Sequence, residues 1–436
     1  MIDQKEYAQR RSQLFAQMLD NSIAIVPTAP EHWHSTDEFL DYRPDYNFYY
    51  LTGFTEPEAI AVFIKSEGHE QFILFNRPRD EKKEQWLGAR AGQLKAVSDY
   101  HADEAYGIDE FAGQISILLT NKKSMYYPLG RYADVEALIN DALKKLRFRV
   151  RSGVRVPDTV MDINQILFAM RLIKTPAEIE VMQKAADISV DAHIRAMQTC
   201  RPGMFEYEIE AELHYEFRRR GASGYAYPSI VAGGKNACIL HYVENDQKLR
   251  DGDLLLIDAG AKYQGYNADI TRTFPVNGTF SGRQKVLYEV VLNAQLAVIE
   301  AVKPGNSWAQ MNEIAERKLT EGALDIGLLK GSVDQIIEEK AFRSVYMHHV
   351  AHWLGLDVHD VGAYKTDDQW QTLQPGMVTT VEPGLYVKPG LENVDEAWWG
   401  MGVRIEDNIC VTDNGHEILT AKAPKTVKDI EAAMRL

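Results

Sequence analysis

Residues 253–274 read DLLLIDAGAKYQGYNADITRTF, and this stretch decides the fold of the second half of the chain. It contains two β-rich runs joined by a tight turn, which is typical of a hairpin. If Tyr263 and Gln264 form a two-residue loop, antiparallel pairing places Asp258 directly opposite Asp269. The two Cβ atoms would then lie roughly 4.5–5.5 Å apart on one side of the hairpin. Carboxylates this close repel each other unless a cation lies between them, so the hairpin predicts a metal site.

A simpler interpretation is that the two aspartates only flank the turn. Asp258, however, follows the apolar run at residues 254–257 and should be at least partly buried. Buried aspartates without a partner are rare. The sequence therefore favours a metal site over an ordinary turn.

Three later segments supply further donor groups. They are HHVAHWLGLDVHD at residues 348–360, TTVEPGLY at 379–386 and GVRIEDNI at 402–409. Glu382 ends an apolar run, and Pro383-Gly384 stop the strand where a site can open. Arg404 and Glu406 alternate onto one face of a strand, so the guanidinium can hold a carboxylate oxygen. Either glutamate alone could belong to a salt-bridged strand end, but the segments together indicate one shared site.

Histidines are concentrated in the first of these segments. His348, His352 and His359 fall within twelve positions, and His349 lies among them. The segment has no HExxH pattern of a helical zinc site, and a lone buried histidine is more often a core residue than a ligand. The density indicates a functional site, but the spacing does not select the ligand. Histidines that bind no metal would bind substrate or orient the site.

Four carboxylates and one imidazole form an oxygen-rich set of ligands. The carboxylates are those of Asp258, Asp269, Glu382 and Glu406. Such a set suits hard or borderline divalent ions, Mn²⁺ before Zn²⁺. Two ions of this kind can share a water molecule, lower its pKa and turn it into a hydroxide nucleophile. The set therefore predicts hydrolysis.

Length and composition narrow the class of protein. A chain of 436 residues is too long for one ordinary core, which predicts two domains. The formal net charge of −15 argues against a nucleic-acid partner, which requires a basic face. Three cysteines without a CxxC pair indicate buried thiols in a reducing compartment. With no signal-peptide core and no apolar run of roughly 18 residues, we expect a cytoplasmic protein and no membrane partner.

A change in the order of elements divides the chain near residue 170. Residues 1–170 predict an α/β domain, with a helix at 4–20, strands at 22–27, 59–65 and 71–76, and a helix around 134–146. Thr175, Pro176 and Glu178 then supply the cap, the first position and the capping-box acid of a new helix. We therefore expect a second domain at 171–436.

Within the second domain the expected order of elements repeats. Helices at 176–198 and 205–221 precede strands near 226–232, 253–260 and 266–274, and helices at 282–302 and 308–322 precede strands near 350–358, 377–382 and 402–411. This order suggests two halves related by a pseudo-two-fold axis. The aspartates lie in the first half and the other donors in the second, which predicts a pocket at the seam.

These segments resemble the aminopeptidase P (Xaa-Pro aminopeptidase) branch of the metallopeptidases with the pita-bread fold. The resemblance rests on RLIKTPAEIEVM (171–182), RPGMFEYEIEAELHYEF (201–217), ILHYVEND (239–246), LRDGDLLLIDAGAKYQGYNADITRTFPVNG (249–278), HWLGLDVHDVG (352–362), LQPGMVTTVEPGLY (373–386) and GVRIEDNI (402–409). DYRPDYNFYYLTGFTEPEA, at 41–59, looks like the first domain of this family. The resemblance covers nearly the whole chain and implies an α/β N-terminal domain followed by an α+β pita-bread catalytic domain.

The resemblance also assigns the metal ligands. It selects His352 as the histidine and implies two Mn²⁺ ions per subunit, with Co²⁺ or Zn²⁺ as other candidates. Asp269 and Glu406 would bridge the ions, and Asp258 would bind one of them through both oxygens. His352 and Glu382 would complete the other ion, and Glu382 would pass a proton from the nucleophile to the leaving proline nitrogen.

Further residues match positions that serve the substrate in this family. His241 and His359 match histidines that help to stabilise the tetrahedral intermediate, and His348 matches another histidine that lines the pocket. Arg404 matches an arginine behind the ligands. His349 stands where the family often has a small residue, so it puts a bulkier group at that loop of the pocket.

The implied activity is release of the N-terminal residue from peptides whose second residue is proline. A peptide bond to proline lacks an N–H group, so proteases that grip this donor handle it poorly. A metal pair that polarises the carbonyl does not need that donor. The proline ring can be held by shape, with Tyr386 a candidate.

Two other functions compete with this interpretation. Prolidase shares the five-ligand set but cleaves only Xaa-Pro dipeptides, and the segments at 201–217 and 352–362 favour aminopeptidase P. A non-catalytic pita-bread binding module is disfavoured, because such members lose metal ligands and this chain retains all five.

Relatives of this type often form dimers or tetramers in which the N-terminal domain closes a neighbour's active site. We therefore expect a homo-oligomer whose N-terminal domain controls substrate access and makes the oligomer contacts. Trp86 and Arg151 occupy positions that would reach the substrate.

Overall fold

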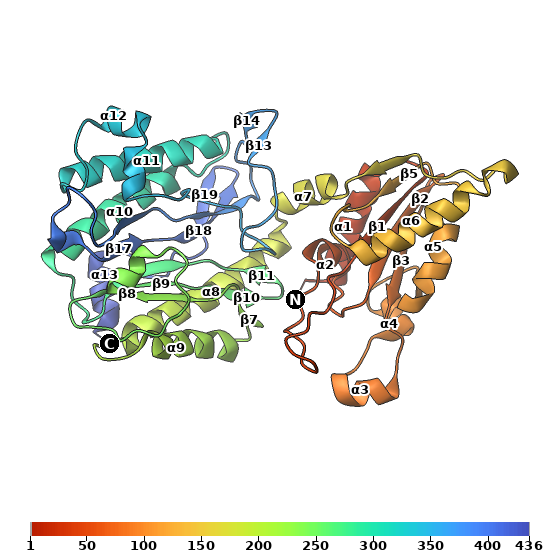
Figure 1. The fold of residues 1–436 in the computed structure, drawn as a ribbon, viewed down its shortest axis with the longest axis horizontal. Helices are drawn as coiled ribbons and strands as arrows, with labels where there is room; N and C mark the ends of the chain where they lie inside the picture. Colours follow the sequence, from red (N-terminus) through yellow and green to blue (C-terminus); the bar gives the residue numbers. More distant parts are fainter. Residues whose placement is uncertain (1, 436) are drawn as a thin grey trace. The chain divides into compact units, whose positions relative to one another are not determined.

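The computed structural model describes residues 2–435, which form two compact units (Figure 1). One unit is Ile2–Met170, and the other begins at Arg171. No helix in the described part of the chain is long and apolar enough to cross a membrane. Cys200, Cys238 and Cys410 are all buried free thiols, as their spacing predicts.

A six-stranded sheet with strand order β4-β3-β2-β1-β5-β6 forms the centre of the first unit. Its strands are β1 (Ser22–Pro27), β2 (Ile60–Ser66), β3 (His69–Asn76), β4 (Glu104–Gly107), β5 (Ser124–Tyr126) and β6 (Thr159–Met161). Its helices are α1 (Gln4–Gln17), α2 (Tyr46–Thr52), α3 (Glu81–Leu87), α4 (Gly92–Ser98), α5 (Phe111–Leu119) and α6 (Ala133–Arg147), and α7 (Asn164–Leu172) runs on into the second unit. The strands and helices predicted here are present, with ends shifted by at most three residues. Apolar residues of β1 to β3, such as Ile25, Val62 and Phe75, pack against α5 and α6 to form the core.

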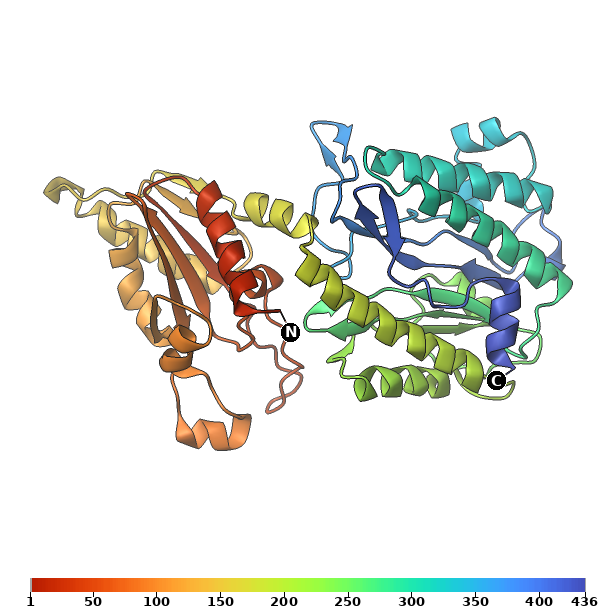
Figure 2. The ribbon, with the colours of Figure 1, turned by 180° about the vertical axis from the view of Figure 1, so that it is seen from behind.

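Two helix pairs enclose the strands of the second unit. They are α8 (Pro176–Thr199) with α9 (Glu206–Arg219), and α10 (Gly282–Ala301) with α11 (Trp308–Asp325). Both views show one pair on each side of the strands (Figures 1 and 2). The predicted start of α8 is confirmed, because the Thr175 hydroxyl accepts from the Glu178 N–H and the Glu178 carboxylate accepts from the Thr175 N–H. The expected α+β pita-bread architecture is therefore present.

Short strands between the helix pairs form several small sheets. The first half contributes β7 (Gly224–Tyr225), β8 (Ile230–Gly233), β9 (Leu254–Asp258), β10 (Ala261–Tyr263), β11 (Tyr266–Asn267) and β12 (Thr271–Pro275). The second half contributes β13 (Lys365–Thr366), β14 (Gln369–Trp370), β15 (Val378–Val381), β16 (Gly384–Val387), β17 (Met401–Arg404), β18 (Asp407–Thr412) and β19 (Gly415–Ile418), with α12 (Val333–Glu338) before them and α13 (Val427–Met434) after them. β12, β9 and β8 form one sheet, and β15, β18 and β19 form another.

The predicted register of the central hairpin is wrong by two residues. Gln264 and Gly265, not Tyr263 and Gln264, form the turn, and both have positive φ (49° and 85°). A two-residue hairpin turn of this twist needs positive φ at both positions, which favours glycine inside the loop. Asp258 is consequently paired with Thr271 instead of Asp269. A shift of two keeps every side chain on its face, so both aspartates still point to the same side.

The strand expected near residues 350–358 is absent. Only an isolated bridge joins Trp353 to Thr379. The chain turns back on itself instead, with the Gly355 N–H bonded to the Asp357 carbonyl and the Asp360 N–H bonded to the Trp353 carbonyl. The strands expected at 266–274 and 402–411 each divide in two, and the interruptions contain Asp269 and Glu406.

Gly260 offers a test of the hairpin. A Cβ at this position would lie 1.7 Å from the Ala268 carbonyl oxygen, so Gly260→Ala must force the two strands apart. We expect overpacking to lower the free energy of unfolding by about 1–3 kcal/mol, measured by urea denaturation. Gly282→Ala is the matched control, because a Cβ at Gly282 meets no atom within 4 Å. Equal stability of the two variants would contradict the close approach.

Candidate metal centre

The four carboxylates and His352 converge on one cavity of about 1010 Å³ in the second unit. Each carboxylate stands where a strand ends or is interrupted. Asp258 is the last residue of β9, Asp269 lies between β11 and β12, Glu382 follows β15, and Glu406 lies between β17 and β18. These strand ends belong to both halves of the unit, so the two halves contribute carboxylates to the same cavity.

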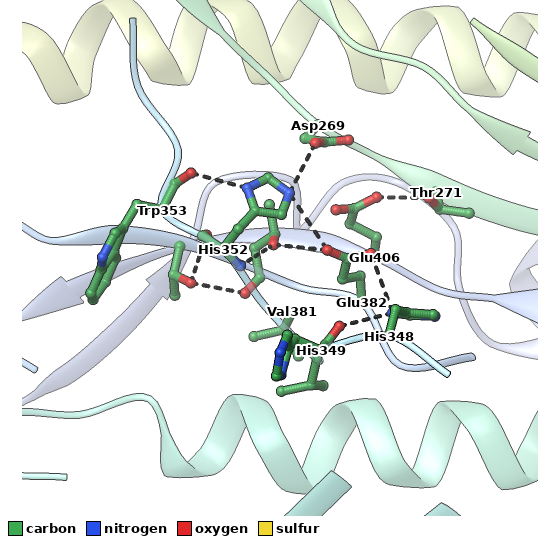
Figure 3. Close-up of polar contacts among 12 residues, drawn as sticks. Asp269, Thr271, His348, His349, His352, Trp353, Val381, Glu382 and Glu406 are labelled. Atoms are coloured by element: carbon green, nitrogen blue, oxygen red, sulfur yellow. Dashed lines mark hydrogen bonds and ion pairs between the residues drawn. The ribbon is translucent and has the colours of Figure 1, made fainter. Parts of the chain in front are cut away.

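Three of these residues form the tightest group. Asp269, His352 and Glu406 each offer one donor atom, and these atoms lie within 4.8 Å of one another. The His352 Nε2 atom is 3.4 Å from Asp269 Oδ2 and 3.5 Å from Glu382 Oε1 (Figure 3). Its Nδ1 atom lies 3.0 Å from the Trp353 carbonyl, which can only accept, so Nδ1 carries the proton. Nε2 is therefore the nitrogen that faces the carboxylates, and it is the atom that would give up its proton to bind a metal ion.

The backbone near His352 is fixed by β15. Its N–H donates to Thr380 Oγ1 (3.0 Å), and its carbonyl accepts from the Thr380 N–H (2.9 Å). The Thr379 hydroxyl also donates to that carbonyl (2.9 Å). These bonds hold His352 next to Glu382, which follows the same strand.

Glu406 and Asp258 are each held by a neighbour. The Thr271 hydroxyl donates to Glu406 Oε2 (2.7 Å). Arg404 Nη2 donates to Asp258 Oδ2 (2.7 Å), and Arg404 Nε donates to the Thr271 hydroxyl (3.2 Å). Arg404 thus lies behind the donor set, where it orients one carboxylate and supports another.

Tyr386 is placed differently from the sequence prediction. Its side chain is fully buried and does not line the cavity, so it is not positioned to hold a proline ring. Its hydroxyl accepts from Arg404 Nη1 (3.0 Å) and donates to His348 Nε2 (2.8 Å). The His348 Nδ1 atom donates to the His349 carbonyl (2.8 Å), which leaves Nε2 as the acceptor. Tyr386 therefore fixes the orientation of a cavity histidine.

Tyr227 is a site residue that sequence reasoning missed. Its hydroxyl lies 2.6 Å from Asp258 Oδ1 and also makes a short hydrogen bond with Asp269 Oδ1. The Tyr-Pro pair just before β8 was the available signal, but it does not show where the ring points. That follows from pairing of β8 with β9, which places Ile230 beside Asp258 and brings Tyr227 over the aspartates.

Burial and mutual repulsion shift the pKa values of the donor set. Burial raises the pKa of Glu382 to about 7. Burial also raises the pKa of Glu406 well above its usual range, and the negative charges of Asp269 and Glu382 add to that shift. Burial also raises the pKa of Asp258, although Arg404 opposes the shift. Burial alone would lower the pKa of His352, but hydrogen bonding to Asp269 and the charge of Glu382 raise it to about 9. Protons thus compensate for concentrated negative charge, which is the role a divalent cation would fill.

The remaining predicted residues fall into two groups. His241, His348 and His359 line the cavity, and the His359 ring meets the His352 ring edge-on at 4.4 Å. His349 lines the cavity as well and is exposed to solvent. Trp86, on α3, and Arg151, in a turn at Val150–Ser152, belong to the first unit, and both are exposed.

Comparison with known families identifies the chain. The model of metallopeptidase family M24 matches residues 180–413, and that of the aminopeptidase P N-terminal domain matches residues 7–127. The chain belongs to the aminopeptidase P branch of family M24. This confirms the resemblance inferred from the sequence motifs.

Individual relatives agree with this membership. The chain is 45% identical to the Xaa-Pro aminopeptidase of Escherichia coli over 434 residues, which cover 99% of this chain and 98% of that protein. The structure of Pseudomonas aeruginosa aminopeptidase PepP matches with a TM-score of 0.98 at 48% identity, covering 100% and 98% of the two chains. Zinc-substituted E. coli aminopeptidase P in complex with product matches with a TM-score of 0.97 at 45% identity, with the same coverage.

The donor set fits the metal ions that a member of this family requires. Carboxylate oxygens outnumber the single imidazole, which suits hard or borderline divalent ions. The donors come from both halves of the unit, and no backbone rearrangement is needed to bring Asp269, His352 and Glu406 within reach of one ion. The chain is thus a metallopeptidase, and this cavity holds its candidate metal site.

Adding Mn²⁺ to the metal-stripped protein should raise its Tm. A ligand that binds only the folded chain stabilises it by about 2.7 kcal/mol at one hundred times its Kd. Asp269→Asn should remove most of the shift, measured by differential scanning fluorimetry, because it removes one charge from the centre of the donor set. Asp334→Asn changes the same charge at an exposed residue and should keep the full shift. A full shift in Asp269→Asn would place the metal elsewhere.

Proposed function

We propose that this chain is an Xaa-Pro aminopeptidase, which releases the N-terminal residue from peptides whose second residue is proline. The observation that carries the proposal is the convergence of four carboxylates and His352 on one cavity. The same chain matches relatives named Xaa-Pro aminopeptidase over nearly its full length.

The proposed cofactor is a pair of Mn²⁺ ions, with Co²⁺ or Zn²⁺ as alternatives. Asp269 and Glu406 would hold both ions, Asp258 would complete one, and His352 and Glu382 would complete the other. Such a pair supplies Lewis-acid polarisation of a carbonyl and a water that is easily deprotonated. Asp269 and Glu406 are the two carboxylates of the tightest group of donors, which supports their bridging role.

The protein's own side chains would perform the remaining steps. Glu382, at the cavity wall between His352 and His348, would take a proton from the nucleophilic water and pass it to the leaving proline nitrogen as the bond breaks. His241 and His359, which line the cavity outside the carboxylate group, would donate hydrogen bonds to the oxygen that gains charge. His348 would border the proline position. Its ring is kept in place by the hydrogen bond from the Tyr386 hydroxyl behind it.

Removing either bridging carboxylate tests this arrangement. Asp269→Asn and Glu406→Gln should each abolish hydrolysis of an Xaa-Pro-Xaa tripeptide, because each variant removes a ligand that both ions share. The measurement is kcat, with metal content determined on the same samples. Retained activity with bound metal would refute the bridging assignments.

Prolidase is the second candidate function, because it uses the same ligand set. Kinetics on Xaa-Pro dipeptides and on Xaa-Pro-Xaa peptides separate the two activities. We expect efficient release of the first residue from the longer peptides and none from matched peptides with alanine in the second position. Turnover of the dipeptide alone would make the chain a prolidase.

A homo-oligomer, either a dimer or a tetramer, completes the proposal. In it the first unit would control substrate access, with Trp86 and Arg151 beside a peptide. The Trp86 side chain, 87% exposed in a single chain, supports such a contact. The three free thiols support a reducing, cytoplasmic environment.

Substitution of Trp86 tests the oligomer. Trp86→Ala should lower kcat/KM for tripeptides several-fold without lowering Tm, because the exposed ring stabilises nothing within its own chain. Light scattering would report the oligomeric state. A monomer with full activity would contradict the proposed contact.

A further inference from the structure

We propose that Asp360 is a positioning residue for His359, which it holds against the metal centre by anchoring the loop at residues 353–360. The inference rests on the proposed function, in which His359 acts on the substrate. Asp360 points away from the cavity and touches neither the ligands nor the cavity, so any effect on catalysis must pass through its neighbour.

A buried ion network fixes the Asp360 carboxylate. Arg171 Nη2 donates to Oδ1 (2.6 Å), and Lys174 Nζ donates to Oδ2 (2.9 Å). The Asp360 and Lys174 side chains are each 1% exposed, and that of Arg171 is 3% exposed. Arg171 also donates to the half-exposed Asp357 (2.7 Å), in the same loop. Burial alone would raise the pKa of Asp360, but Lys174 and Arg171 hold it below the usual range, so the carboxylate stays charged.

The backbone of Asp360 and the ring of His352 are hydrogen-bonded to the same carbonyl oxygen. The Asp360 N–H donates to the Trp353 carbonyl (2.9 Å), which also accepts the proton of His352 Nδ1 (3.0 Å). One carbonyl oxygen therefore sets both the tautomer of a metal ligand and the position of the residue after His359. The Asn267 side chain, two residues before Asp269, adds bonds to the carbonyls of Gly355 and Leu356 (3.0 and 2.7 Å).

Gly355 shows how closely the loop wraps the carboxylate. A Cβ at this position would lie 2.2 Å from Asp360 Oδ2 and 3.0 Å from the Lys174 side chain. The loop can therefore close around the ion network only with glycine here.

His359 depends on this anchoring because its ring is otherwise weakly held. Within residues 2–435 the ring has no hydrogen-bond partner, and its aromatic contact is the edge-on one with His352. The ring also faces an open cavity instead of a packed core. Its place must come from the backbone, and the bonds of Asp360 fix that backbone.

The test is a double-mutant cycle on the metal-loaded enzyme with an Xaa-Pro-Xaa tripeptide. Asp360→Asn should lower kcat about tenfold or more, as loss of an outer partner of a metal site commonly does, with full metal content. In a His359→Ala background, Asp360→Asn should change kcat less than twofold. A crystal structure of Asp360→Asn should show the His359 ring displaced from its contact with His352. Asp334→Asn, at an exposed ion pair with Arg317, is the matched control and should retain wild-type kcat.

Lys174→Met is the second variant, in case Asp360→Asn does not fold. It removes one partner of Asp360 but leaves the Asp360–Arg171 ion pair, so no unpaired charge is buried. It should lower kcat several-fold, again only when His359 is present. Independent, multiplicative effects of Asp360 and His359 would overturn the proposal, as would wild-type kcat in folded Asp360→Asn or Lys174→Met. A wild-type enzyme without activity on any Xaa-Pro peptide would instead refute the proposed function, which keeps the two failures distinct.

Discussion

The fully buried guanidinium of Arg272 is the interaction on which the metal centre depends. Its five N–H groups donate to five acceptors: the carbonyls of Pro424, Thr271, Glu406 and Ala423, and the Asp407 carboxylate. A buried charge is tolerated only when its hydrogen bonds are complete and an opposite charge is present, and both conditions hold here. Arg272 belongs to β12 of the first half and Asp407 to β18 of the second. The pair therefore locks the two halves together beside Glu406.

This lock lets the unit tolerate an unfavourable concentration of charge. Two buried carboxylates, Asp269 and Glu406, and two partly buried ones share a cavity with the cationic groups of Arg404 and His352, so their repulsion would open a loosely packed site. The Asp407 carboxylate also accepts hydrogen bonds from Lys425, Gln295 and Thr420, which strengthen the contact between the two halves. Repulsion among these carboxylates is thus opposed by structure outside the cavity, which keeps the donors in place for metal.

Local rules predicted much of the fold and of the donor set. The helix start at Thr175, the buried strands of the first unit and the two helix pairs follow from capping residues and apolar periodicity, which act over a few positions. The predicted hairpin register was wrong by two residues, because the sequence shows that Gly265 is near the turn but not which position of the turn it occupies. The strand expected at 350–358 is missing because only residues 350–354 bond to the segment at 378–382, which is distant in sequence, and the chain turns from Gly355 onward.

The sequence by itself determined which residues are candidates for the chemistry: four carboxylates at strand ends or breaks, together with a histidine-rich segment, predict a metal site. Only the tertiary structure decided how these groups meet. It placed Tyr386 behind His348 instead of in the cavity, brought Tyr227 onto both aspartates, and joined Arg171 and Lys174 to Asp360. Residue type fixes charge and hydrogen-bonding capacity, whereas the direction of a side chain depends on packing between segments far apart in the chain.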